Sequence, residues 1–125
     1  MSNTTFTLFD GLQIGTTKHM EVELRVPNAG DIIDGGMESE RLVPTPDGGF
    51  VLVQSPYMVG LNVLRRQVVH VGSYQGPLSL ADLRLLSRDD LALIQQRAEQ
   101  LDQALAQGIS DRGRAAAPGD GANQS

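Results

Sequence analysis

The most informative stretch of the chain spans residues 76–105 and reads GPLSLADLRLLSRDDLALIQQRAEQLDQAL. It predicts a short helix, a break and then a long helix that follows Ser87, because Ser87 and Asp90 have the spacing of a capping box, with Asp in place of the usual Glu or Gln. Along the long helix, apolar residues recur every three or four positions and form a narrow seam suited to packing on one other helix: Leu91, Ile94, Ala98, Leu101 and Leu105. The stretch therefore points to association rather than catalysis, and we predict that this seam binds a partner.

The N-terminal part has the two-residue alternation of strands. Residues 5–14 and 19–26 both alternate, and the second run places Met20, Val22 and Leu24 on one face and Glu21 and Glu23 on the other. We predict an N-terminal β-hairpin with one buried face.

The middle of the chain predicts shorter elements. Asn28 is placed to cap a short helix that Gly35 and Gly36 should stop, residues 37–49 look irregular, and residues 50–54 form a short strand or lead into the next helix. Ser55 and Pro56 are a good start for a helix that should run to Val71 and end at Gly72. The two later helices are predicted over residues 79–86 and 88–107, with Gly108 as the C-cap of the last.

Composition limits the function classes. The chain has 125 residues, no cysteine and a net charge of −5, and its first 54 residues hold eight acidic residues against three basic ones. An acidic half argues against nonspecific binding of nucleic acid, which depends on clustered Lys and Arg. No apolar run approaches the length of a membrane span, and the N-terminus lacks the pattern of a signal peptide. These features predict a soluble, intracellular protein without disulfides.

No catalytic or metal-binding motif stands out. His19 and His70 are far apart and lack a triad pattern, so a structural or surface role is the better interpretation. Asp31 and Asp34 share a helix face, but no third ligand is evident, and we interpret them as solvated acids of a first helical turn. We predict no enzymatic activity, no cofactor and no metal.

Several segments resemble the tail assembly chaperones of long-tailed phages, the group often called tail protein E. The segment LRVPNAGD, starting at Leu24, is similar to the family's Leu-Arg-x-Pro-x-x-Gly-Asp/Thr segment. A middle helix that ends LRRQVVHVG at Gly72 follows in the same order as in the family. The later segments GPL, Leu80 to Leu86 and SRDDLALI resemble the family's C-terminal helices. The resemblance covers most of residues 5–105. The chain departs from the pattern between Met37 and Pro56, where Pro44 to Val53 looks like an added β-turn-β, and after Gly108.

The resemblance implies a function. Such a chaperone binds the long, helical tape measure protein in the host cytoplasm, keeps it soluble, helps to load tail tube protein around it and is absent from the mature virion. Families of this kind often make a second, longer form by ribosomal frameshifting. The seam fits this role, because it can lie against an amphipathic partner helix, and on this interpretation Ile94→Asp or Leu101→Asp abolishes partner binding while the hairpin stays folded.

Two other classes use the same features. A self-associating tail or baseplate structural protein would use the seams for a homo-oligomer and stay in the particle. A small transcriptional regulator would use the last two helices as a helix-turn-helix, but Asp89, Asp90, Glu99 and Asp102 would repel phosphate.

The sequence therefore predicts an α+β fold: an N-terminal β-hairpin followed by a small helical bundle and a disordered C-terminal tail. Residues 1–108 form the single domain, and residues 109–125 form the tail, which has few apolar residues larger than alanine.

Overall fold

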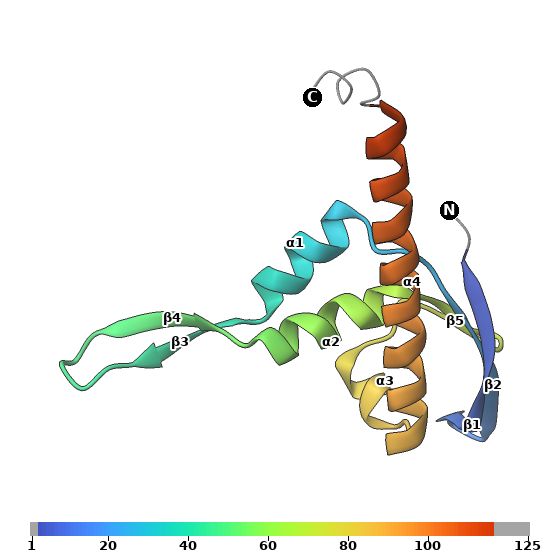
Figure 1. Cartoon of the computed structure of the whole chain (residues 1–125). Coiled ribbons are helices and arrows are strands. Elements are labelled where there is room, and N and C mark those ends of the chain that lie inside the picture. Colours follow the sequence, from blue (N-terminus) through green and yellow to red (C-terminus); the bar gives the residue numbers. More distant parts are fainter. Residues whose placement is uncertain (1–2, 117–125) are drawn as a thin grey trace.

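A computed structural model describes residues 3–116 of the chain (Figure 1). Its elements, in chain order, are β1 (Thr4–Ile14), β2 (Thr17–Leu24), α1 (Ala29–Glu38), β3 (Glu40–Pro44), β4 (Phe50–Gln54), α2 (Pro56–Gln67), β5 (Val68–Val71), β6 (Tyr74–Gln75), α3 (Leu80–Arg84) and α4 (Arg88–Ala116). The molecule is a body of one sheet and four helices, from which the β3–β4 hairpin and the end of α4 project.

The main sheet has four antiparallel strands in the order β1-β2-β5-β6. The predicted N-terminal hairpin is confirmed: Thr4 pairs with Leu24 and Phe6 with Val22, and the register shifts between Thr7 and Leu12. Val22 and Leu24 are fully buried, as their alternation with acidic residues predicts.

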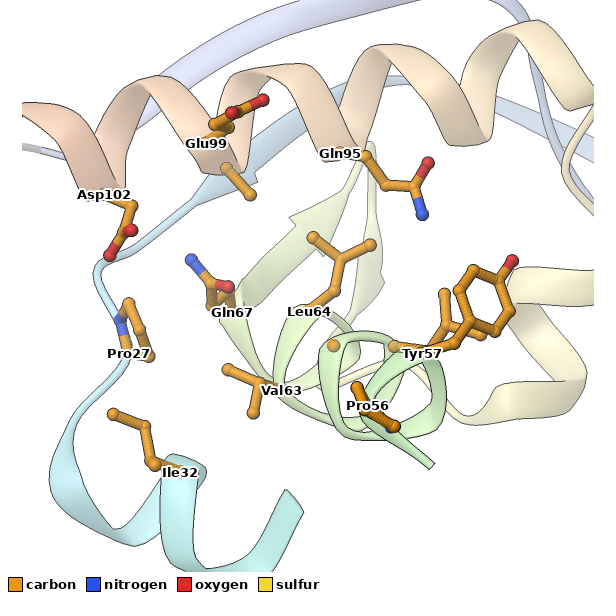
Figure 2. A pocket seen from close by; sticks show the side chains of 13 residues that line it. Pro27, Ile32, Pro56, Tyr57, Val63, Leu64, Gln67, Gln95, Glu99 and Asp102 are labelled. Carbon is orange, nitrogen blue, oxygen red and sulfur yellow. The ribbon is translucent and has the colours of Figure 1, made fainter. Parts of the chain in front are cut away.

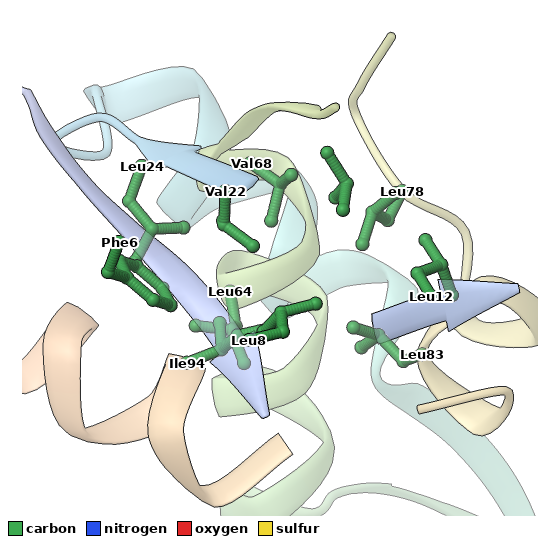
Figure 3. Close-up of a cluster of buried hydrophobic side chains, with 11 residues drawn as sticks. Phe6, Leu8, Leu12, Val22, Leu24, Leu64, Val68, Leu78, Leu83 and Ile94 are labelled. Atoms are coloured by element: carbon green, nitrogen blue, oxygen red, sulfur yellow. The ribbon is translucent and has the colours of Figure 1, made fainter. Parts of the chain in front are cut away.

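The core lies between one face of this sheet and the helices α2, α3 and α4 (Figure 3). The sheet contributes Phe6, Leu8, Leu12, Val22, Leu24, Val68 and Val71; the helices and the loop before α3 contribute Leu64, Leu78, Leu83 and Ile94. Arg97 of α4 covers the edge of this core, with its guanidinium carbon 5.0 Å from the centre of the Phe6 ring. The core is aliphatic apart from Phe6, as the low aromatic content requires.

The predicted helix over residues 56–71 is wrong at its end. Helix α2 begins as predicted, with the Ser55 side chain accepting from the Met58 N–H, but it ends at Gln67. The next four residues form β5, which pairs with β2 and buries Val68 and Val71. Pairing with the hairpin favours the extended backbone that β-branched residues prefer, and Gly72, at φ +57, makes the turn to β6 instead of capping a helix.

The segment 35–54 differs from its prediction only in part: the added β-turn-β and the short strand over residues 50–54 are confirmed, but the first strand begins before Pro44. Helix α1 continues through Gly35 and Gly36 to Glu38, and part of the region interpreted as irregular is β3, paired with β4 from Glu40–Gln54 to Pro44–Phe50. Gly35 is kept within the helix because α1 packs closely on α2: a Cβ there would lie 2.7 Å from Val63 Cγ2.

The C-terminal helix is longer than predicted. Helix α4 runs through Gly108 to Ala116, so Gly108 is not its C-cap. The remainder of the predicted tail, residues 117–125, lies outside the described residues. The α+β class is confirmed, but a lone hairpin followed by a helical bundle does not describe the molecule, because β5 and β6 extend the hairpin to four strands on which the helices pack.

Candidate partner-binding groove

An open groove lies between α1, α2 and α4 and has a volume of about 540 Å³ (Figure 2). Ile32 of α1 forms one side, Leu61, Val63 and Leu64 of α2 form the floor, and Ala98 of α4 forms the opposite wall. Ile32 is 55% exposed. The Ile32 side chain therefore exposes apolar surface to solvent within a concave site.

One rim of the groove is acidic. Glu99 and Asp102 of α4 lie one turn apart along the groove, and both are exposed. Tyr57, at the start of α2, lies at the other end and is 65% exposed. The groove thus combines an apolar floor with an acidic edge, a pattern that suits an apolar segment flanked by cations.

The position of α1 is set by the segment that carries the family resemblance. Asn28 caps α1 by accepting from the Asp31 N–H at 2.9 Å, and the Asp31 carboxylate accepts from the Asn28 N–H at 2.8 Å. Arg25 donates to both Asp31 oxygens, at 2.6 and 3.0 Å, and to the Arg66 carbonyl at 2.8 Å. These bonds join the start of α1 to the end of α2, so the LRVPNAGD segment has a structural role.

The same bonds favour the charged carboxylate form of Asp31. Hydrogen bonds from Arg25 lower the pKa of Asp31 despite its burial. Asp31 is 8% exposed, so its interpretation as a solvated acid was wrong. The sequence signal was the three-residue spacing from Asn28, which marks a capping box.

A second ion-pair cluster holds the far end of α1 to α2. Glu38 accepts from both Arg65 and Arg66, with the Arg66 Nη1 to Glu38 Oε1 distance at 3.0 Å. These hydrogen bonds lower the pKa of Glu38 from 4.5 to about 2. The Asn62 amide donates to the Ser39 hydroxyl at 2.9 Å in the buried space between the helices. Both ends of α1 are thereby held against α2, beside the groove.

The predicted seam of α4 is divided between the core and the surface. Ile94 is fully buried and packs in the core, so it is no surface residue and Ile94→Asp would disrupt the fold. Ala98 lines the groove, while Leu91 lines a smaller one of about 180 Å³ with Tyr57 and Leu61. Leu101 and Leu105 are half-buried, and Leu101 packs on the core. The seam is therefore mainly the face of α4 that packs on the chain's own core. Of the five seam residues, Ala98 is the one that lines the large groove.

The groove residues of α1 were missed by sequence reasoning. Ile32 and Ile33 are adjacent on the short helix, but only Ile32 lines the groove, and Ile33 is 59% exposed. The available sequence signal for this surface was the pair of adjacent isoleucines in a short helix that starts beside a capping acid, Asp31.

A buried carboxylate fixes α4 to the sheet. Asp90 is fully buried and accepts from three consecutive backbone N–H groups in the irregular part of β1, those of Phe9, Asp10 and Gly11, at 2.6, 3.0 and 2.8 Å. The Ser87 hydroxyl accepts from the Asp90 N–H at 3.1 Å, as predicted. The carboxylate half of the predicted capping box is used elsewhere, because it bonds to β1.

The described residues offer little for other kinds of site. Within residues 3–116, no three His, Asp or Glu side chains are grouped closely enough to hold a metal ion. His70 Nε2 lies 3.0 Å from a Glu23 carboxylate oxygen, and His19 lies beside Tyr74, so the two histidines have separate surroundings. In the same part of the chain, every helix is too short or too polar to cross a membrane.

The chain is similar in sequence to known phage tail assembly proteins. Residues 8–114 match the sequence profile of the family described as "Tail assembly protein gp41". The chain is 44% identical to the "Probable tail assembly protein gp41" of Escherichia phage Mu, over 88% of this chain and 79% of that protein. It is 41% identical to the "Mu-like prophage FluMu protein gp41" of Haemophilus influenzae, over 83% of this chain and 82% of the relative.

A longer relative also matches. The "Probable tail assembly protein FS-gp41" of Escherichia phage Mu is 42% identical over 82% of this chain, but the match spans only 56% of that protein. No solved structure matches the chain. The match over residues 8–114 and the identities above 40% show that the chain belongs to the gp41 family of Mu-type phage tail assembly proteins.

Proposed function

We propose that this chain is a tail assembly chaperone that binds the phage tape measure protein through the groove between α1, α2 and α4. It would keep that protein dispersed in the host cytoplasm while tail tube protein is added around it, and it would leave before the virion is complete. The observation that carries the proposal is an exposed apolar groove with an acidic rim in a member of a tail assembly family. The role requires no enzymatic step, cofactor, nucleic acid or membrane.

The groove suits an amphipathic helix. Three helices surround an apolar floor, the arrangement in which a partner helix lays its apolar stripe into a groove. Glu99 and Asp102 favour a stripe flanked by Lys or Arg. We therefore propose a tape measure segment with apolar residues at helical spacing and cations on one flank.

The seam contributes to this surface in part. Ala98 lies in the groove, and Leu91 lies in the adjoining smaller one, so both are proposed to contact the partner. Leu101 and Leu105 are half-buried and lie farther along α4, where a longer partner helix would reach them. Ile94 acts through the core, by fixing α4 as the wall of the groove.

The test is co-expression of the tagged chain with the tape measure protein of the same phage, followed by pull-down and a solubility assay. The wild-type chain should retain the tape measure protein in the soluble fraction. Glu99→Lys should reduce the retained amount several-fold, whereas Glu21→Lys, the same charge change on the exposed face of β2, should leave it unchanged. Equal losses in both variants would contradict binding at the rim.

A second function, a self-associating tail or baseplate component, is favoured by the projecting apolar hairpin β3–β4. The two functions differ in whether the mature virion contains this chain. Mass spectrometry of purified virions should find none of this chain if it is a chaperone, and several copies per particle if it is a structural component.

A further inference from the structure

The hairpin formed by β3, β4 and the turn between them, here called the arm (residues 40–54), extends away from the body (Figure 1). Every residue of its two strands is exposed. Six of them are large and apolar: Leu42, Val43, Phe50, Val51, Leu52 and Val53. We propose that the arm is a dimerisation element, in which β4 pairs edge to edge and antiparallel with β4 of a second copy of this chain, centred on Leu52.

Both faces of the arm are apolar. Leu42 pairs with Leu52 on one face, and Val43 pairs with Val51 on the other. A two-stranded hairpin is at best marginally stable alone in water, and an exposed apolar strand is a template for pairing with another chain. The arm therefore has the composition of an element that is covered in an assembly.

The two edges of the arm differ in their ability to pair. The Thr45 N–H donates to the Gly49 carbonyl at 2.9 Å. Because hydrogen-bonded pairs alternate along an antiparallel ladder, the N–H and C=O groups of residues 50, 52 and 54 point outward on β4, and those of residues 40, 42 and 44 point outward on β3. On β3, Pro44 has no N–H to offer, and Glu40 and Arg41 add charge; both features protect an edge from pairing. The β4 edge has all three outward donors.

The sequence of β4 matches a second copy of itself. Leu52 is the middle of its five residues, so a two-fold axis there pairs Phe50 with Gln54 of the second copy, Val51 with Val53 and Leu52 with Leu52. None of these residues is charged, although the chain as a whole carries a net charge of −5. The arm thus lets two acidic bodies join through an uncharged edge that stands away from both. This inference goes beyond the proposed function, because the groove is lined by Pro27, α1, α2 and α4 rather than by the arm.

A matched pair of variants tests the proposal in the full chain. Leu52→Lys places two like charges opposite each other at the two-fold axis. Leu42→Lys is the control: Leu42 is the partner of Leu52 in the hairpin, but it lies on β3, the edge that is protected from pairing. In sedimentation equilibrium, Leu52→Lys should raise the dimer dissociation constant at least about tenfold relative to Leu42→Lys. A mixture of Leu52→Lys and Leu52→Glu should restore a heterodimer.

Cysteine cross-linking gives a second readout, because the chain has no native cysteine. A hydrogen-bonded antiparallel pair has Cα atoms about 5.5 Å apart, within reach of a disulfide. Leu52→Cys should therefore form a disulfide-linked dimer on mild oxidation, and Leu42→Cys should not. A wild-type chain that stays monomeric at all concentrations, or equal weakening by both lysine variants, would overturn the proposal.

Discussion

At the scale of single residues, Asp90 joins the start of α4 to strand β1. Its carboxylate receives three N–H groups that the irregular part of β1 cannot use in the sheet ladder, and it does so from the first turn of α4. One side chain thus satisfies the backbone of β1 and sets where α4 crosses the sheet. Partly buried N–H groups left without a partner cost free energy, so this contact stabilises the fold.

We predict that Asp90→Ala lowers the free energy of unfolding by about 3 kcal/mol, because three partly buried N–H donors lose a fully buried charged acceptor. Urea denaturation followed by circular dichroism measures this change. Asp89→Ala, next to it but exposed, should cost less than about 1 kcal/mol through the helix dipole. Equal costs would show that the charge of the first turn matters and the bonds to β1 do not.

Glu38 makes stability depend on pH. Its pKa is lowered from 4.5 to about 2 in the folded chain by Arg66 and Arg65, so its contribution is complete above pH 4.5 and is lost as the pH falls towards 2. Its side chain is 42% exposed, so solvent screening limits the contribution to about 1 kcal/mol or less.

The corresponding prediction compares Glu38→Gln with the wild type. The melting temperature of the variant should be lower at pH 6, and the difference should disappear as the pH approaches 2. Glu21→Gln removes one carboxylate from the exposed face of the sheet and serves as the control. A difference for Glu38→Gln that persists unchanged at pH 2 would show that the side chain acts through packing and not through its charge.

The limits of sequence reasoning at this scale follow from distance along the chain. The spacing between Ser87 and Asp90 predicts the cap correctly, but the partners of the Asp90 carboxylate lie about 80 residues away. Likewise, the seam spacing places Ile94 on the apolar face of its helix and led to the prediction that it binds a partner, but the fold shows that it packs in the chain's own core.

At the scale of elements, the contact between α1 and α2 depends on glycine. A Cβ on Gly35 would meet Val63 of α2 at 2.7 Å, whereas a Cβ on Gly36 would approach only the end of the Gln54 side chain, at 3.4 Å. Glycine is unfavourable inside a helix, so its presence at position 35 reflects the close approach of the two helices.

Gly35→Ala should therefore lower the free energy of unfolding by about 1–3 kcal/mol, because overpacking outweighs the gain in helix propensity. Gly36→Ala should be neutral or stabilising by up to about 1 kcal/mol. Thermal unfolding of the two single variants distinguishes these effects, and stabilisation by both would contradict the close packing.

The elements that the sequence predicts well are those with a complete local signal. The β1–β2 hairpin has clear alternation, and the predicted start of α2 at Ser55 and Pro56 is confirmed. The short helix predicted over residues 79–86 is also present, as α3, with Ser79 as its N-cap. Strand β5 was predicted as helix because four residues are too short to show a period, and only its pairing with β2 decides its conformation. The arm shows no alternation, since both of its faces are apolar; its strand β4 was therefore predicted only as one of two alternatives, and the start of β3 was interpreted as irregular.

At the scale of the whole molecule, two surfaces lie on separate parts of the chain. The groove belongs to the body, between three helices, and the arm projects from the junction of α1 and α2. This separation suggests that partner binding and self-association can be removed one at a time.

We predict that replacing residues 41–53 by Gly-Gly, between Glu40 and Gln54, leaves the body folded. Gln54 keeps its hydrogen bond to the Gly36 carbonyl, and the deleted residues are exposed. The melting temperature should change by less than about 3 °C, while dimerisation is lost and tape measure binding is retained. Loss of tape measure binding in this folded variant would place the partner on the arm.

The central claim, that the groove binds the tape measure protein, is tested most directly by titrating tape measure fragments into two neighbouring variants. Ile32 lines the groove and Ile33 does not, yet both are more than half exposed on α1. Calorimetry should give a dissociation constant at least about tenfold higher for Ile32→Asp than for Ile33→Asp, since burial of an isoleucine contributes about 1.5–3 kcal/mol. Equal dissociation constants for the two folded variants would contradict the groove as the binding site.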